Sequence, residues 1–195
     1  MKRTVLLLLA VILLCVGVLS GCGNMSAAKQ KYVKLSLEQG DIIIELYPEV
    51  APESVKHFLS CVKSGYYDGK VFNRNAGVLI QGGSSDGFGV GGSGKTVVGE
   101  FEANGYENNL KHERGVVSLA RTNDPDSASG QFFIMTQAVP SLDGSYAAFG
   151  KVVEGMDIVD EIAAMPTRGL ALEDLIVKPV IKKAEVLKNY TPPKE

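Results

Sequence analysis

The stretch QFFIMT, residues 131–136, places four consecutive apolar residues between two polar ones. A short apolar run rich in aromatic and β-branched residues is typical of a buried β-strand. Three similar runs, separated by glycine-rich or polar segments, are VLIQ at 78–81, GVVSLA at 115–120 and AAFGKVV at 147–153. The middle of the chain is therefore predicted to be rich in short strands.

A β-hairpin is predicted upstream of these runs. Apolar residues alternate with polar ones in 33–38, the segment Gln39-Gly40-Asp41 supplies a turn, and the alternation resumes in 42–46. A period of two is the pattern of a strand with one buried face.

Helical spacing occurs twice. Pro52 stands near the start of a segment whose apolar residues recur at i, i+3, i+4 and i+7, and Gly65 ends it. A second helix is predicted around Val159 to Ala163, and a last β-rich run spans roughly 176–188. Many short strands, two helices and no regular alternation of strand and helix favour an antiparallel barrel or sandwich.

The first 21 residues have the features of a signal peptide: Lys2-Arg3, an apolar run from Val5 to Val18, and a small-residue ending. Leu19-Ser20-Gly21-Cys22 resembles the lipobox of bacterial lipoproteins, in which the cysteine is lipidated and becomes the first mature residue. Cys22 is therefore the expected lipidation site, and residues 22–31 are expected to form a short tether. We expect anchoring on the outer side of the cytoplasmic membrane, or beyond it.

Composition limits the other possibilities. The formal net charge is −2, which does not favour a nucleic-acid partner. Of the cysteines, Cys15 lies in the signal peptide and Cys22 in the lipobox, so Cys61 is left without a disulfide partner, and we expect it to be buried in the first helix. The two histidines lack metal-ligand spacing, so no metal or other cofactor is expected.

Two nucleotide-binding motifs overlap in GVGGSGKT, residues 89–96: a phosphate-binding loop and a dinucleotide fingerprint. Both motifs require a strand before the loop and a helix directly after it. The residues that follow, Val97-Val98-Gly99, are β-branched and then broken by glycine. We therefore expect no helix at this point and no nucleotide.

Four motifs occur in one order along the chain: YYDGKVFNR, GVVSLAR, SASGQFFIMT and FGKVVEGMDIV. Together they resemble the cyclophilin family of peptidyl-prolyl cis-trans isomerases, over residues 32–188, with 189–195 as a polar tail. The resemblance implies a mainly β fold, a closed eight-stranded antiparallel β-barrel capped by two α-helices. It also implies monomeric isomerases that act on X–Pro bonds of envelope or secreted proteins.

By the same resemblance, Arg74 matches the catalytic arginine, which donates a hydrogen bond to the proline nitrogen of the twisted amide. Gln81 matches a residue that contacts the peptide backbone. The residues that would line the proline pocket or flank the peptide are Val78, Leu79, Ala120, Arg121, Gln131, Phe133, Leu142 and Tyr146.

The chain departs from the family pattern in four places. The segment Asn75-Ala76 after Arg74 is one residue shorter and lacks a proline, and Val78 replaces a common aromatic residue. Asn73 replaces a common histidine, and Ser141 a common tryptophan. The first two differences leave open a proline-peptide-binding or chaperone module with reduced isomerase activity. A purely structural envelope domain is a third alternative, but it would not need the polar residues Arg74 and Gln81.

Overall fold

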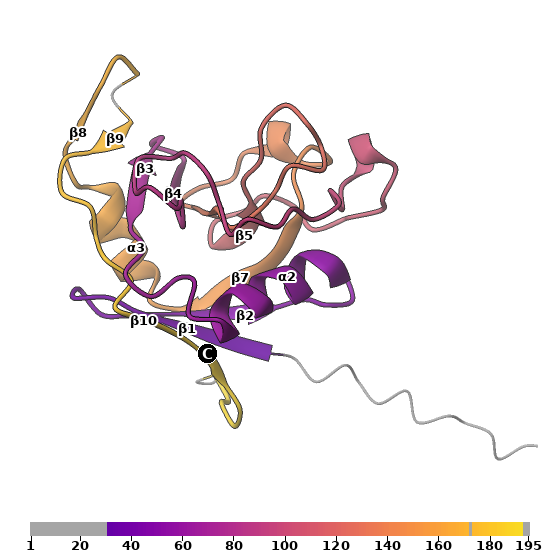
Figure 1. The fold of residues 1–195 in the computed structure, drawn as a ribbon, viewed down its shortest axis with the longest axis horizontal. Helices are drawn as coiled ribbons and strands as arrows, with labels where there is room; N and C mark the ends of the chain where they lie inside the picture. Colours follow the sequence, from indigo (N-terminus) through magenta and orange to yellow (C-terminus); the bar gives the residue numbers. More distant parts are fainter. Residues whose placement is uncertain (1–30, 172, 193–195) are drawn as a thin grey trace, which may run out of the picture.

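The computed structural model describes residues 31–171 and 173–192. The predicted signal peptide, Cys22 and most of the tether therefore lie outside the described residues. Within them, all strands join one antiparallel sheet of ten strands in the order β10-β1-β2-β7-β5-β6-β4-β3-β9-β8 (Figure 1). The strands are β1 Lys31–Ser36, β2 Asp41–Leu46, β3 Phe72–Asn75, β4 Leu79–Gly82, β5 Val116–Leu119, β6 Phe132–Met135, β7 Ala148–Glu154, β8 Thr167–Arg168, β9 Asp174–Leu175 and β10 Lys183–Leu187.

The predicted hairpin and helices are confirmed. Strands β1 and β2 pair antiparallel, with Leu35 opposite Ile42, and Leu37 N–H donates to the Gly40 carbonyl in the turn. The two α-helices of the described part are α2, Pro52–Lys63, and α3, Met156–Ala163. The buried face of α2 carries Val55, Phe58, Leu59 and Val62, the residues whose spacing predicts it.

The strands β4, β6 and β5 carry apolar residues on both faces. Ile80, Ile134 and Val117 lie opposite one another and belong to the main core, which also holds the buried faces of both helices. Leu79, Phe133 and Met135 point to the other side, into a second and smaller cluster. Since side chains alternate across a strand, the run QFFIMT supplies both clusters.

The mainly β fold with two helices is confirmed, but the closed eight-stranded barrel is not. The sheet has ten strands because the short hairpin β8–β9 extends it beyond β3. The segment before β3 meets the segment before β10 at an isolated bridge, Val71 to Val180. Three backbone hydrogen bonds join the same segments: Phe72 N–H donates to the Pro179 carbonyl, Gly69 N–H to the Ile181 carbonyl, and Ile181 N–H to the Lys70 carbonyl.

The glycine-rich segment 82–94 forms a loop, as expected. After Thr96 the chain makes a single bridge from Val97 to Ala128 and then a 3-10 turn, η1, Glu102–Asn104. No helix follows the loop directly, as predicted. The segment therefore lacks the strand–loop–helix arrangement that a phosphate-binding loop requires. In the described part of the chain, no helix has the length and apolar character that crossing a membrane requires.

Candidate functional site

A row of four side-chain positions crosses the sheet on its outer face. Arg74 on β3 lies opposite Gln81 on β4, Gln81 opposite Phe133 on β6, and Phe133 opposite Ser118 on β5. The antiparallel register thus brings together residues from four separate segments of the chain. Three of them, Arg74, Gln81 and Phe133, are predicted site residues.

A cleft of about 430 Å³ opens over this row. Phe133 and Leu79 lie buried in the apolar cluster beneath it, and Leu142, on the 3-10 turn η2 (Pro140–Leu142), lines the cleft with Tyr146. All the predicted substrate-site residues except Gln131 line the cleft. Its complete lining is Arg74, Ala76, Val78, Leu79, Gln81, Ala120, Arg121, Phe133, Val139, Leu142, Tyr146 and Glu173.

The guanidinium of Arg74 is held at two of its nitrogens. Nε donates to Glu173 Oε2 at 2.6 Å, and Nη1 donates to Gln81 Oε1 at 3.0 Å. No described residue accepts a hydrogen bond from Nη2. The side chain remains 39% exposed, so this nitrogen is free to donate to a molecule in the cleft.

The shortened segment after Arg74 forms a tight turn between β3 and β4. Ala76 N–H donates to the Leu79 carbonyl, and Gly77 N–H donates to Asn75 Oδ1 at 2.9 Å. Gly77 has φ of +77°, a conformation that favours glycine. This turn leaves Arg74 in the lining of the cleft.

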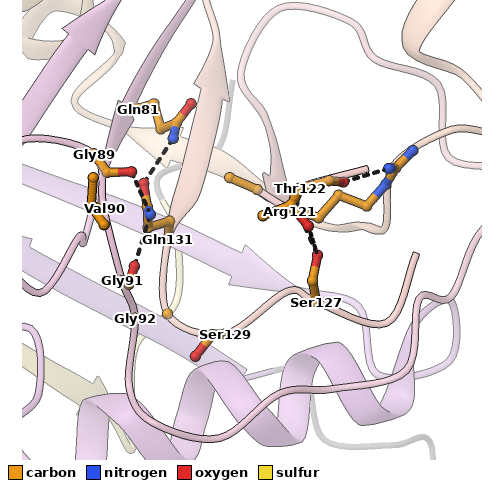
Figure 2. Close-up of a pocket in the computed structure, with 12 residues that line it drawn as sticks. Gln81, Gly89, Val90, Gly91, Gly92, Arg121, Thr122, Ser127, Ser129 and Gln131 are labelled. Atoms are coloured by element: carbon orange, nitrogen blue, oxygen red, sulfur yellow. Dashed lines mark hydrogen bonds between the residues drawn. The ribbon is translucent and has the colours of Figure 1, made fainter. Parts of the chain in front are cut away.

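Gln131 lies beside the cleft in an adjoining pocket of about 450 Å³ that shares Gln81, Ala120 and Arg121 with it. Figure 2 shows the Gln81 amide beside that of Gln131. Gln81 Nε2 donates to Gln131 Oε1 at 2.9 Å, and Gln131 Nε2 donates to the carbonyls of Gly89 and Gly91. Gln131 thus joins the glycine-rich loop to the polar row of the cleft.

Arg121 is held in a different way from Arg74. Nε and Nη2 donate to the Ser145 carbonyl, and Nη1 donates to the Thr122 carbonyl. The guanidinium carbon lies 4.9 Å from the centroid of the Phe101 ring and 4.8 Å from that of Tyr146. Cation–π contacts of this kind fix the ring as well as the cation, so Arg121 supports the wall of the cleft.

Behind Phe133 lies a buried polar group that the sequence analysis does not identify. His112 Nδ1 lies 3.1 Å from Asp143 Oδ1, and its Nε2 lies 2.9 Å from Ser118 Oγ. Since a carboxylate only accepts, Nδ1 carries the proton and Nε2 accepts from the serine hydroxyl. The imidazole stacks on Phe133, with ring centroids 6.0 Å apart.

Burial lowers the pKa of His112, although the hydrogen bond to Asp143 acts in the opposite direction. Burial raises the pKa of Asp143, but the hydrogen bonds from the His112 backbone and ring outweigh it, and the net shift is downward. The pair is therefore a neutral imidazole beside a carboxylate. Ser118 and His112 are 0% and 2% exposed, so they support Phe133 and do not reach a substrate.

The cleft also contains residues that no sequence pattern indicates. Glu173 and Val139 line it, and Glu173 comes from a segment 99 residues away from its partner Arg74. Cys61 is buried in α2, as expected. Among the described residues, no group of three or more histidine, cysteine or carboxylate side chains is arranged to hold a metal ion.

Known proteins resemble this chain over most of its length. Residues 32–186 match the family model of the cyclophilin-type peptidyl-prolyl cis-trans isomerases. A peptidyl-prolyl cis-trans isomerase of Acinetobacter baylyi is 39% identical over 156 residues, 77% of this chain and 81% of the relative. The isomerase cyp18 of Streptomyces antibioticus is 38% identical over 167 residues, 80% of this chain and 98% of the relative.

Two solved structures of a cyclophilin-type isomerase also superpose on this chain. A cyclophilin-type isomerase of Cryptosporidium parvum superposes with a TM-score of 0.74 at 30% identity, over 83% of this chain and 99% of its own. A second structure of that protein, determined in the presence of the dipeptide Ala-Pro, superposes with a TM-score of 0.73 at 30% identity, over 81% of this chain and 99% of its own.

Proposed function

The chain belongs to the cyclophilin-type peptidyl-prolyl cis-trans isomerases, and we propose that it accelerates rotation about X–Pro bonds through a hydrogen bond from Arg74 to the proline nitrogen. The isomerase activity follows from the family and from curated relatives named as isomerases. The observation that supports the role of Arg74 is its place in the cleft, held at Nε and Nη1 with Nη2 free.

Rotation about an X–Pro amide faces a barrier near ~20 kcal/mol and takes on the order of tens to hundreds of seconds without a catalyst. No bond is made or broken. At the transition state the amide loses its resonance, and the proline nitrogen gains a lone pair that accepts a hydrogen bond. A fixed cationic donor beside that nitrogen stabilises the twisted state more than the planar one. A thousandfold acceleration needs roughly 4 kcal/mol of this preference.

The apolar part of the cleft would hold the proline ring. Phe133 and Leu142 offer it apolar contacts, and Val78 in place of an aromatic residue leaves that wall less filled. Gln81 keeps one Nε2 hydrogen after its bond to Gln131, and this hydrogen can donate to a carbonyl of the peptide. Ala120 and Arg121 would flank the bound chain, with Gln131 beside the adjoining pocket.

Our proposal for location rests on Leu19-Ser20-Gly21-Cys22. The protein would be a lipoprotein of the bacterial envelope, anchored through Cys22, with proline-containing envelope or secreted proteins as substrates. Cys22→Ser should abolish labelling by a radioactive fatty acid and release or misprocess the protein. Labelling that persists in this variant would contradict the proposal.

An isomerisation assay tests the function directly. The full-length protein in mild detergent should accelerate the cis-to-trans conversion of a short Ala-Pro peptide in proportion to its concentration. Binding of the same peptide by calorimetry, with no acceleration, would favour a peptide-binding module in place of the enzyme. Neither binding nor acceleration would favour a structural domain.

A further inference from the structure

Glu173 contacts Arg74 from outside the row of side chains that crosses the sheet beneath the cleft. Its Oε2 accepts from Arg74 Nε at 2.6 Å, and the two side chains are 33% and 39% exposed. A carboxylate is a stronger acceptor than the amide of Gln81, which holds Nη1 at 3.0 Å. Of the two groups that hold Arg74, Glu173 therefore forms the shorter and the charge-assisted bond.

The backbone holds Glu173 in this place. Asp174, the next residue, pairs with Arg74 across β3 and β9, and Asn75 N–H donates to the Glu173 carbonyl at 2.8 Å. The hairpin β8–β9 carries the segment, with Thr167 opposite Leu175. Arg74 thus lies on β3, and Glu173 directly precedes β9, the strand that pairs with β3. The backbone bond from Asn75 N–H to the Glu173 carbonyl holds the residue beside Arg74.

The two bonds to Arg74 define the orientation of a planar group. A guanidinium held at Nε alone or at Nη1 alone can still swing about its stem, whereas bonds at both nitrogens fix its plane. With the plane fixed, the two N–H groups of Nη2 have fixed directions. A donor held in advance avoids the cost of reorganisation when the transition state forms.

We propose that Glu173 is a positioning residue for Arg74, an inference that rests on the proposed function. It holds the guanidinium with Nη2 free for the proline nitrogen and does not itself contact the reacting amide. Partly exposed ion pairs add little to stability, so the effect of Glu173 lies in turnover and not in folding.

Three substitutions of Glu173 distinguish the effect of its hydrogen bond to Arg74 from the effect of its negative charge. Glu173→Ala removes the carboxylate acceptor. Glu173→Asp keeps the carboxylate on a side chain one methylene shorter, and Glu173→Gln keeps an oxygen acceptor at the same length without the charge. We expect kcat to fall about fivefold or more in the alanine and aspartate variants, with KM within about twofold, because only the transition-state contact is affected. The glutamine variant should retain at least about half of the wild-type kcat. Asp174→Ala, an exposed neighbour on the same hairpin, is the matched control and should leave kcat unchanged.

A second measurement does not depend on activity. The Nε–H signal of Arg74 in a ¹⁵N NMR spectrum should be shifted and slowly exchanging in the wild type and in Glu173→Gln, and averaged in Glu173→Ala. An unaltered signal and an unaltered kcat in Glu173→Ala would overturn the proposal, as would an equal loss of kcat in the glutamine and alanine variants. A wild-type protein without turnover would contradict the proposed function, while the NMR signal would still report whether Glu173 positions Arg74.

Discussion

Arg74 and Arg121 both border the cleft, but their hydrogen bonds differ in kind. Nε, Nη1 and Nη2 of Arg121 all donate to backbone carbonyls, and its cation lies over two aromatic rings. Arg74 has a carboxylate and an amide as partners and retains a free Nη2. The geometry therefore favours Arg74 as the donor to the substrate and Arg121 as a support of the wall.

At the residue scale, His112 makes stability depend on pH. Its pKa in the folded protein is lowered from the ordinary value of 6.5, chiefly by burial. Above pH 6.5 the histidine is neutral in both states, and this contribution to stability is fully present. As the pH falls through 6.5, the unfolded chain binds a proton that the folded protein does not, and the free energy of unfolding decreases.

We expect the unfolding free energy to decrease more steeply below pH 6.5 in the wild type than in His112→Gln, because only the wild type has a histidine here that binds a proton on unfolding. Urea unfolding at several pH values measures it. The pKa of Asp143 is lowered from 3.8, so its contribution to stability is present above pH 3.8 and is lost as the pH falls further. Identical slopes in both proteins below pH 6.5 would show that His112 is not held neutral.

At the element scale, a residue distant in sequence caps the N-terminus of α2. Ala51 offers no side-chain cap. Instead the buried carboxylate of Glu100 accepts from Glu53 N–H at 3.0 Å, from Ser54 N–H at 2.8 Å and from Ser54 Oγ at 2.7 Å. These bonds satisfy backbone donors that a helix start leaves unpaired, and a negative charge is favourable at that end.

Glu100→Gln should therefore lower the free energy of unfolding by about 1–3 kcal/mol, because the amide accepts at only one of the two oxygen positions and leaves a buried donor unpaired. Urea denaturation gives the value. Glu102→Gln, an exposed acidic residue two positions away, is the control and should change stability by less than about 0.5 kcal/mol. Equal stability of Glu100→Gln and the wild type would contradict this role.

The elements differ in how far sequence patterns predict them. The hairpin has a period of two, α2 and α3 have helical spacing, and the four middle strands are continuous apolar runs; the structure contains all of them. Strands β8 and β9 have two residues each and no period to recognise. Their pairing depends on the tertiary position of β3, so the extension of the sheet beyond eight strands could not be predicted from local patterns.

At the scale of the whole molecule, some residues of the cleft belong to local sequence patterns and others do not. Arg74, Gln81 and Phe133 lie within recognisable motifs, and the register of β3, β4 and β6 brings them into one row. Glu173 and His112 act through contacts with partners that no local pattern links to them. Sequence patterns predict most of the residues that line the cleft, while the contacts that hold them depend on the folded arrangement.

We propose above that the free Nη2 of Arg74 accelerates rotation of the X–Pro amide. The kcat/KM of Arg74→Ala and Arg74→Lys for an Ala-Pro peptide, compared with the wild type, tests it most directly. We predict a loss of about ten- to a hundredfold in Arg74→Ala, or ~1.4–2.7 kcal/mol of transition-state stabilisation. Arg74→Lys should not restore activity, because an ammonium lacks the planar fork, and the melting temperature should change little.

Arg121→Ala, measured in parallel, is predicted to alter KM more than kcat, because Arg121 supports the wall and has no nitrogen free of intramolecular bonds. Near-normal kcat/KM in Arg74→Ala, together with a large loss of kcat in Arg121→Ala, would contradict the account and assign the catalytic donor to the other arginine.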